Sequence, residues 1–184
     1  MSTNNDRERK ILTIYFSMKG QTIWKGMRVV DLKEGNTAVA AKFIQKAVGG
    51  DIFEIETTKT YSPDHMKMIY EARDEMRSGE KAQPKHWLEN LEDYDIIYVG
   101  YPLWWGTYPP IINTFLDHYD LKGKTLIPFN TSEGSGKLST DQELRNRYGQ
   151  ARVLNGAAWT GSAVRDMEGE IGRWAKARLA EATE

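Results

Sequence analysis

Short apolar runs alternate with amphipathic segments along almost the whole chain, and this alternation limits the possible folds more than any other feature. The runs are rich in β-branched and aromatic residues, as buried strands are, and the segments between them carry apolar residues at helical spacing. We expect strands at residues 11–16, 52–55, 95–101, 125–129 and 151–158, the last weakened by Asn155-Gly156. We expect helices at residues 37–48, 64–77, 109–116, 141–148 and 164–179.

Strands that alternate with helices form a parallel sheet covered on both faces, so the predicted fold class is α/β, with a doubly wound five-stranded parallel sheet. The chain of 184 residues fits one domain, residues 11–184, preceded by a polar N-terminal arm, residues 1–10, that we expect to be flexible. In such sheets, ligands bind beyond the carboxyl ends of the strands. The loops after the first, third and fourth strands are therefore the places to look for a site.

Composition excludes several classes of function. The chain has no cysteine, so disulfides, thiolate nucleophiles and sulfur-ligated metals are excluded, and redox chemistry needs a bound cofactor. Its 25 basic and 26 acidic side chains give no reason to expect nucleic acid as a partner. No segment is apolar enough for a signal peptide or a membrane span, so we expect a cytoplasmic protein. The three histidines lack the spacing of a metal site, and no Ser–His–Asp set is supported, so we assign no metal ligand and no catalytic side chain.

The loop after the first strand ends at the start of a helix and suits a phosphate group. Helix starts leave free N–H groups and carry partial positive charge, so they bind phosphate without a lysine. Ser17, Asn36 and Thr37 can add further donors, although this loop alone slightly favours the interpretation that Asn36 or Thr37 is only an N-cap. Neither a Walker-type loop nor a Gly-x-Gly-x-x-Gly fingerprint occurs, which weighs against a nucleotide triphosphatase or a dinucleotide-binding unit.

The loop after the third strand, residues 101–109, is the most informative segment because it carries the adjacent Trp104 and Trp105. Two such residues at a strand's end are hard to explain as core, and their faces suit stacking on a planar ring system. Gly106 lets the backbone approach that ring. A hydrophobic plug or an oligomer interface is the less favoured alternative. The loop after the fourth strand, residues 131–136, is glycine-rich and can present N–H groups to a ring edge.

Together, these loops resemble those of the flavodoxin family, and the resemblance extends from about residue 11 to residue 179. It rests on Tyr15-Phe16-Ser17, Gly35-Asn36-Thr37, Pro102-Leu103-Trp104-Trp105-Gly106 and Thr131-Ser132-Glu133-Gly134-Ser135-Gly136. The resemblance implies non-covalently bound FMN and the strand order 2-1-3-4-5. It assigns the FMN phosphate to Ser17, Gly35, Asn36 and Thr37, the isoalloxazine ring to Pro102, Leu103, Trp104, Trp105 and Gly106, and its pyrimidine edge to Thr131, Ser132, Glu133 and Gly134.

Two features depart from the family pattern. Residues 18–34 separate Ser17 from Gly35, and within them Gly20-Gln21-Thr22 imitates the usual end of the phosphate loop. We favour Gly35-Asn36-Thr37 because a helix follows directly. The many apolar residues of 18–34 predict that this segment folds back over the domain near the phosphate, with Val29-Val30 as a candidate short edge strand. The net charge of −1 also differs from the strongly acidic electron carriers of the family.

Three classes of function remain open. A carrier would pass electrons from FMN to a redox partner protein, whereas an enzyme would take hydride from NADH or NADPH and reduce a quinone or a similar small-molecule acceptor. A structural domain with a vestigial site would leave two exposed tryptophans unexplained. No Arg or Lys cluster is evident near the three loops to hold a second nucleotide's phosphates. We therefore predict an FMN-binding electron-transfer protein, with the NAD(P)H-dependent reductase as the alternative.

Overall fold

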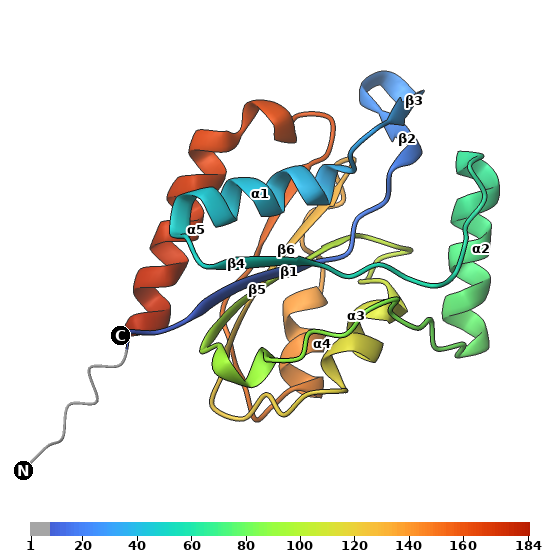
Figure 1. Cartoon of the computed structure of the whole chain (residues 1–184). Helices are drawn as coiled ribbons and strands as arrows, with labels where there is room; N and C mark the ends of the chain where they lie inside the picture. Colours follow the sequence, from blue (N-terminus) through green and yellow to red (C-terminus); the bar gives the residue numbers. More distant parts are fainter. Residues whose placement is uncertain (1–7) are drawn as a thin grey trace, which may run out of the picture.

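A parallel sheet runs through the centre of the protein, with helices on both of its faces (Figure 1). The computed structural model describes residues 8–184, so residues 1–7 of the expected arm lie outside the described residues. The strands of the main sheet are β1 (Ile11–Tyr15), β4 (Asp51–Glu54), β5 (Ile96–Pro102), β6 (Thr125–Ser132), β7 (Arg152–Val153) and β8 (Ala157–Thr160). Their order is β4-β1-β5-β6-β7, with β8 also paired to β6. With β7 and β8 taken as one interrupted strand, this is the predicted order 2-1-3-4-5.

Four of the helices are divided between the two faces of the sheet, and the fifth lies beyond its end. The helices are α1 (Asn36–Val48), α2 (His65–Ser78), α3 (Pro110–Leu116), α4 (Thr140–Arg147) and α5 (Glu168–Thr183). In Figure 1, α1 and α5 cover one face, α3 and α4 cover the other, and α2 lies beyond the end of the sheet. Each face buries its own apolar cluster, one around Ile44 and Ile171 and the other around Ile111 and Phe115. Among residues 8–184, no helix is long and apolar enough to cross a membrane.

The fifth strand, expected as one run at residues 151–158, is instead divided into β7 and β8. Leu126 pairs with Val153 and Phe129 with Ala157, so the fifth strand carries one extra residue between these two pairs. Pro128 of β6 lies in this gap and has no N–H to donate, which interrupts the ladder. The strand therefore bulges at the Asn155-Gly156 position that weakened the sequence pattern.

The helix expected at residues 164–179 also begins differently. A single 3-10 turn, η3 (Val164–Asp166), precedes it, and α5 then runs from Glu168 to Thr183. The backbone leaves the helical region at Met167, with φ −108° and ψ 17°. This turn brings the loop after β8 against the start of α1, which matters for the site described below.

Residues 18–34 form an antiparallel hairpin, β2 (Gly20–Trp24) and β3 (Arg28–Leu32), joined by the turn η1 (Lys25–Met27). Gly20-Gln21-Thr22 is therefore strand rather than a helix start, which leaves Gly35-Asn36-Thr37 as the segment that opens α1. Val29-Val30 is extended, as predicted, but it pairs with β2 and not with the main sheet. The hairpin projects beside α2 at the end of the sheet where β1 terminates (Figure 1).

Candidate functional site

A pocket of about 280 Å³, here called the central pocket, lies at the carboxyl ends of β1, β5 and β6. Nine of the thirteen residues that the resemblance assigned to FMN line it: Ser17, Asn36, Thr37, Pro102, Leu103, Trp104, Thr131, Ser132 and Glu133. Trp105 and Gly106 line an adjoining pocket of about 250 Å³, which shares Leu103 and Trp104 with the central pocket. Gly35 lines a separate groove beside Ser17, and Gly134 lies in the exposed bend after β6. The structure thus brings all three loops to one place.

The start of α1 forms one end of the central pocket. A Cβ at Gly35 would lie 2.2 Å from Ser17 Oγ, so only glycine lets the two loops approach this closely. Ser17 Oγ accepts a hydrogen bond from the Ala38 N–H at 3.1 Å. The N–H groups of Asn36 and Thr37 belong to the first turn of α1 and have no acceptor within the helix. Free N–H groups and the positive end of the helix dipole make this end of the pocket suitable for an anion.

Arg165, which sequence patterns did not single out, lies against the same helix start. Its Nη1 donates to Asn36 Oδ1 at 2.5 Å and its Nη2 donates to the Glu34 carbonyl at 2.7 Å. The guanidinium lies 5.7 Å from the centre of the Trp24 ring in the hairpin. Arg165 therefore joins η3, the start of α1 and the hairpin, and it adds a full positive charge beside the free N–H groups.

The hairpin and α2 supply a wall of the central pocket that the sequence did not assign. The lining residues are Thr22, Ile23 and Leu32 from the hairpin and His65, Met68 and Ile69 from α2. Gln21 Oε1 accepts a hydrogen bond from the His65 N–H at 3.1 Å and so joins the two elements. The inserted segment therefore folds back beside the start of α1, in line with the apolar pattern of residues 18–34.

The two adjacent tryptophans have different environments, which corrects the expectation that neither belongs to the core. Trp104 is only 6% exposed and packs edge-on against Phe16 and Tyr61, with ring centres 5.5 and 5.4 Å apart. Trp105 is 54% exposed, with a left-handed φ of +49°, and its Nε1–H donates to the Ile69 carbonyl at 2.7 Å. Trp104 is thus a core residue with an edge on the pocket, whereas Trp105 joins the loop after β5 to α2.

The loop after β6 is fixed to both neighbouring parts of the site. Thr131 Oγ1 lies 2.8 Å from Thr37 Oγ1, a buried hydrogen bond between this loop and the start of α1. Glu133 is held by Ser162, whose N–H and hydroxyl donate to the two carboxylate oxygens at 2.6 and 2.8 Å. The Leu103 N–H donates to the Thr131 carbonyl at 3.1 Å. These contacts give the pocket a preformed polar rim.

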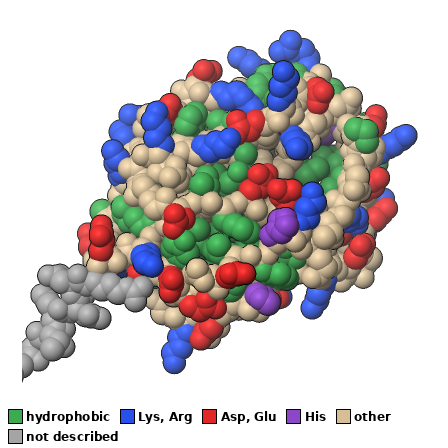
Figure 2. Space-filling model, viewed as in Figure 1, with side chains coloured by type: hydrophobic (Ala, Val, Ile, Leu, Met, Phe, Trp, Pro, Cys, Tyr) green, Lys and Arg blue, Asp and Glu red, His purple; other side chains and the backbone are tan. Residues whose placement is uncertain are grey.

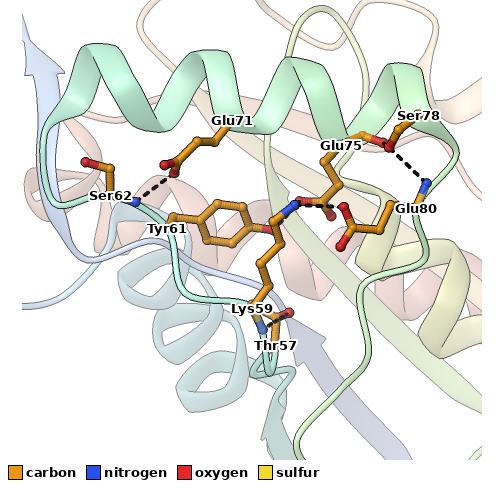
Figure 3. Close-up of polar contacts among 8 residues, drawn as sticks. All are labelled: Thr57, Lys59, Tyr61, Ser62, Glu71, Glu75, Ser78 and Glu80. Carbon is orange, nitrogen blue, oxygen red and sulfur yellow. Dashed lines mark hydrogen bonds and ion pairs between the residues drawn. The ribbon is translucent and has the colours of Figure 1, made fainter.

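A buried carboxylate orders the segment behind Trp104, here called the strap, residues 57–62 (Figure 3). The side chain of Glu75 on α2 is fully buried, and it accepts a hydrogen bond from the Tyr61 hydroxyl at 2.6 Å. Lys59 Nζ lies 3.1 Å from the same carboxylate. Burial, and then the Glu75 carboxylate, raise the pKa of Tyr61, so its phenol stays protonated and donates. The strap thus fixes the ring against which Trp104 packs.

The chemistry available in the pocket is binding by hydrogen bonds, charge and aromatic contact. Within residues 8–184, no group of three or more His, Asp or Glu side chains is arranged to hold a metal ion. A family model described as Flavodoxin matches residues 10–177, which include every loop of the central pocket. The chain belongs to the flavodoxin family.

Individual proteins resemble this flavodoxin-family chain to different degrees. A Bacteroides uniformis protein described as a candidate flavoprotein is 32% identical, with a TM-score of 0.71 over 92% of this chain and 99% of its own. A Lactobacillus acidophilus flavoprotein in complex with FMN shares the fold at 21% identity and a TM-score of 0.61, over 88% of this chain and 99% of its own. A curated Archaeoglobus fulgidus relative, 27% identical over 79% of this chain and 68% of its own length, is named NAD(P)H dehydrogenase (quinone).

Proposed function

We propose that the central pocket binds FMN non-covalently and that the protein transfers electrons through this flavin. The convergence of three loops carries the proposal, because it sets an anion-binding helix start at one end of a pocket and aromatic side chains at the other. FMN has the matching chemistry, since a short polar chain joins its phosphate to a planar ring. Membership of the flavodoxin family and the FMN complex of the Lactobacillus acidophilus protein support the assignment.

At the phosphate end, the N–H groups of Asn36 and Thr37 and the hydroxyl of Ser17 would hold the phosphate oxygens. The Arg165 guanidinium, which donates a hydrogen bond to Asn36 Oδ1, would add a positive charge near the phosphate. This end offers one helix start and no dinucleotide fingerprint, so it suits a mononucleotide better than FAD.

At the ring end, the central and adjoining pockets share five lining residues, Met68, Ile69, Leu103, Trp104 and Ser135. A planar ring would lie between α2 and the loop after β5, with Thr131 and Ser132 near one edge. When bound, FMN supplies one-electron and two-electron transfer. The side chains of this protein would hold the ring, cover it and limit the access of water.

Reconstitution tests the assignment of FMN. Protein freed of flavin is titrated with FMN, FAD and riboflavin while flavin fluorescence is followed, and we expect saturable quenching at one equivalent, tightest with FMN. Asn36→Ala is expected to weaken FMN and leave riboflavin binding almost unchanged, whereas Asn146→Ala, on the exposed face of α4, should alter neither. Tighter binding of FAD than of FMN would contradict the assignment.

A second candidate function is NAD(P)H-dependent reduction of a quinone. The observation that favours it is the name of the Archaeoglobus fulgidus relative. It uses the same FMN but takes hydride from a nicotinamide and passes electrons to a small molecule, so direct reduction by NADH or NADPH separates the two functions.

A further inference from the structure

A groove of about 670 Å³ opens on the β4 side of Ser17. The loop after β1, the first turn of α1 and residues 54–63 form its sides, and it shares only Ser17 and Met18 with the central pocket. Figure 2 shows basic and acidic side chains gathered on the molecular surface between α1 and α2. We call this feature the lysine groove, because lysine dominates its charged residues.

The lysine groove collects basic residues that are far apart in the sequence. Its twenty lining residues include three glutamates and five of the chain's fourteen lysines, Lys19, Lys33, Lys42, Lys59 and Lys85. The expectation that no lysine cluster lies near the first loop is therefore wrong. Lys19 and Lys33 flank the hairpin, and the other three come from α1, the strap and the segment after α2. Only the packing of these parts around β1 brings the five lysines together.

Two of these lysines are available to a ligand. Lys42 and Lys85 form exposed ion pairs with Glu34 and Glu56, and Lys59 is bound to the buried Glu75. Lys19 and Lys33 are exposed and form no hydrogen bond or ion pair within residues 8–184. Exposed ion pairs contribute only about 0–1 kcal/mol, so Lys42 and Lys85 can also turn toward an anion at little cost.

Apolar and aromatic side chains lie between the charged residues of the groove. Met18, Tyr61 and Pro63 are among its lining residues, as are the three glutamates. The Tyr61 hydroxyl is bound to Glu75, which fixes the ring (Figure 3). The buried Phe16 and Ile55 form part of the floor. Lysines beside apolar and aromatic surface are typical of a site for organic molecules with a few charged groups.

We propose that the lysine groove binds a small organic anion, with its apolar body against Tyr61 and Met18 and its anionic group facing Lys19 and Lys33. This site lies beside the central pocket and does not depend on the FMN assignment, because Tyr61, Lys19 and Lys33 line the groove and not the central pocket. The ammonium groups supply charge attraction to the anion, and the fixed ring supplies contact area.

Chemical-shift mapping of the full chain tests this site. Protein labelled with ¹⁵N is titrated with 1-naphthyl phosphate, once as purified and once with saturating FMN, and 1-naphthol serves as the matched neutral probe. We expect saturable shifts in residues 19–20 and 57–63 in both titrations, and much weaker binding of 1-naphthol. The double variant Lys19→Ala/Lys33→Ala should bind 1-naphthyl phosphate about tenfold more weakly, a loss of about 1.4 kcal/mol. The control Lys122→Ala/Lys176→Ala, remote from the groove, should bind it as the parent does.

Three results would overturn the proposal. These are equal binding of both probes to the parent protein, unchanged binding by Lys19→Ala/Lys33→Ala, and shifts confined to Asn36 and Thr131. The last result would mean that the probe enters only the central pocket. The groove can be tested even if FMN does not bind, because each chemical shift is assigned to a residue of the groove or of the central pocket.

Discussion

Arg165 is the charged residue on which we expect recognition of the FMN phosphate to depend. It contacts Asn36 and Glu34 at the start of α1, and its charge lies beside the free N–H groups of the helix. Arg165→Ala should weaken FMN binding about tenfold or more, because hydrogen bonds and ion pairs between charged groups are stronger than those between neutral groups. Riboflavin has no phosphate, so its binding should change little. Fluorescence titrations with both flavins measure the difference.

The matched control for Arg165 is Arg173→Ala, which removes an exposed arginine from α5 and should alter neither titration. An equal loss of FMN and riboflavin binding in Arg165→Ala would mean that the residue acts only by holding Trp24 and the hairpin. The phosphate-recognition role would then be wrong.

The adjacent tryptophans are expected to respond in opposite ways to truncation. Trp104 is buried, so Trp104→Ala should lower the free energy of unfolding by about 3–5 kcal/mol. Trp105 is exposed, so Trp105→Ala should cost less stability and instead weaken FMN by about tenfold. Urea unfolding of the flavin-free variants and FMN titrations measure the two effects. A stable Trp104→Ala, or a Trp105→Ala that binds FMN normally, would contradict these roles.

Most residues of the central pocket could be predicted because their positions follow from topology. Ser17, Trp104 and Thr131 each follow a parallel strand, and the carboxyl ends of such strands meet at one edge. Arg165 and Met68 could not be predicted in this way. They reach the site through the turn at η3 and the position of α2, neither of which leaves a pattern in the local sequence.

At the scale of elements, α2 is held to the strap through Glu75. Glu75→Ala leaves the Tyr61 hydroxyl without its acceptor and removes one of the two carboxylates at Lys59, so it should lower the free energy of unfolding by about 1–3 kcal/mol. Glu75→Gln keeps an acceptor for Tyr61 but loses the charge opposite Lys59, so its loss should be smaller. Urea unfolding measures both variants. Glu80→Ala is the control, because the exposed Glu80 also pairs with Lys59 and should contribute only about 0–1 kcal/mol.

The hairpin is expected to be stabilised by the ligand beneath it. Ile23 and Leu32 line the central pocket, so bound FMN should contact the hairpin. Binding should therefore stabilise the packed hairpin against local unfolding. Trypsin should therefore cleave at Lys25 and Arg28 more slowly in the FMN-loaded protein than in the flavin-free protein. Mass spectrometry of the fragments measures the rates, with cleavage at Lys81, after α2, as an internal control. Equal rates at Lys25 in both forms would mean that the hairpin moves independently of the pocket.

An element could be predicted from the sequence when the interactions that form it lie within its own segment of the chain. Helices such as α1 and α2 follow from apolar spacing and from Asp64, whose side chain accepts a hydrogen bond from the Lys67 N–H and caps α2. The fifth strand is divided because of a residue on another strand. Pro128 of β6 lies opposite Asn155-Gly156 and interrupts the hydrogen bonds between the two strands. The β2–β3 pairing is likewise a contact between two strands, of which the sequence indicated only one.

For the whole molecule, a net charge of −1 gives little long-range attraction to a redox partner. Specific docking would then depend on local surface, and an exposed aromatic pair lies beside the adjoining pocket. Trp105 and Tyr70 are 54% and 45% exposed, with ring centres 6.3 Å apart, and Arg73 lies over both rings. A partner that docks there would come close to the ring end of the site.

The proposed electron-transfer role predicts that a nicotinamide reaches the ring end poorly. A nicotinamide must stack on a face of the flavin to deliver hydride, whereas electron transfer needs only a nearby edge. The adjoining pocket is lined from one side by α2 and from the other by the loop after β5, and the Trp105 bond to the Ile69 carbonyl joins them. A flavin ring held between them, as proposed, would contact both α2 and this loop.

We therefore expect NADH and NADPH to reduce the FMN-loaded protein only slowly, and a separate flavoprotein reductase to reduce it quickly. Flavin absorbance under anaerobic conditions measures both rates. Trp105→Phe keeps an aromatic ring but loses the bond to Ile69, so reduction by NADPH should be faster than in the parent if closure of this edge limits access. Trp87→Phe, remote from the pocket, should leave the rate unchanged. Rapid bleaching of the parent protein by NADPH alone, followed by turnover on a quinone, would instead establish the reductase activity that the name of the Archaeoglobus fulgidus relative suggests.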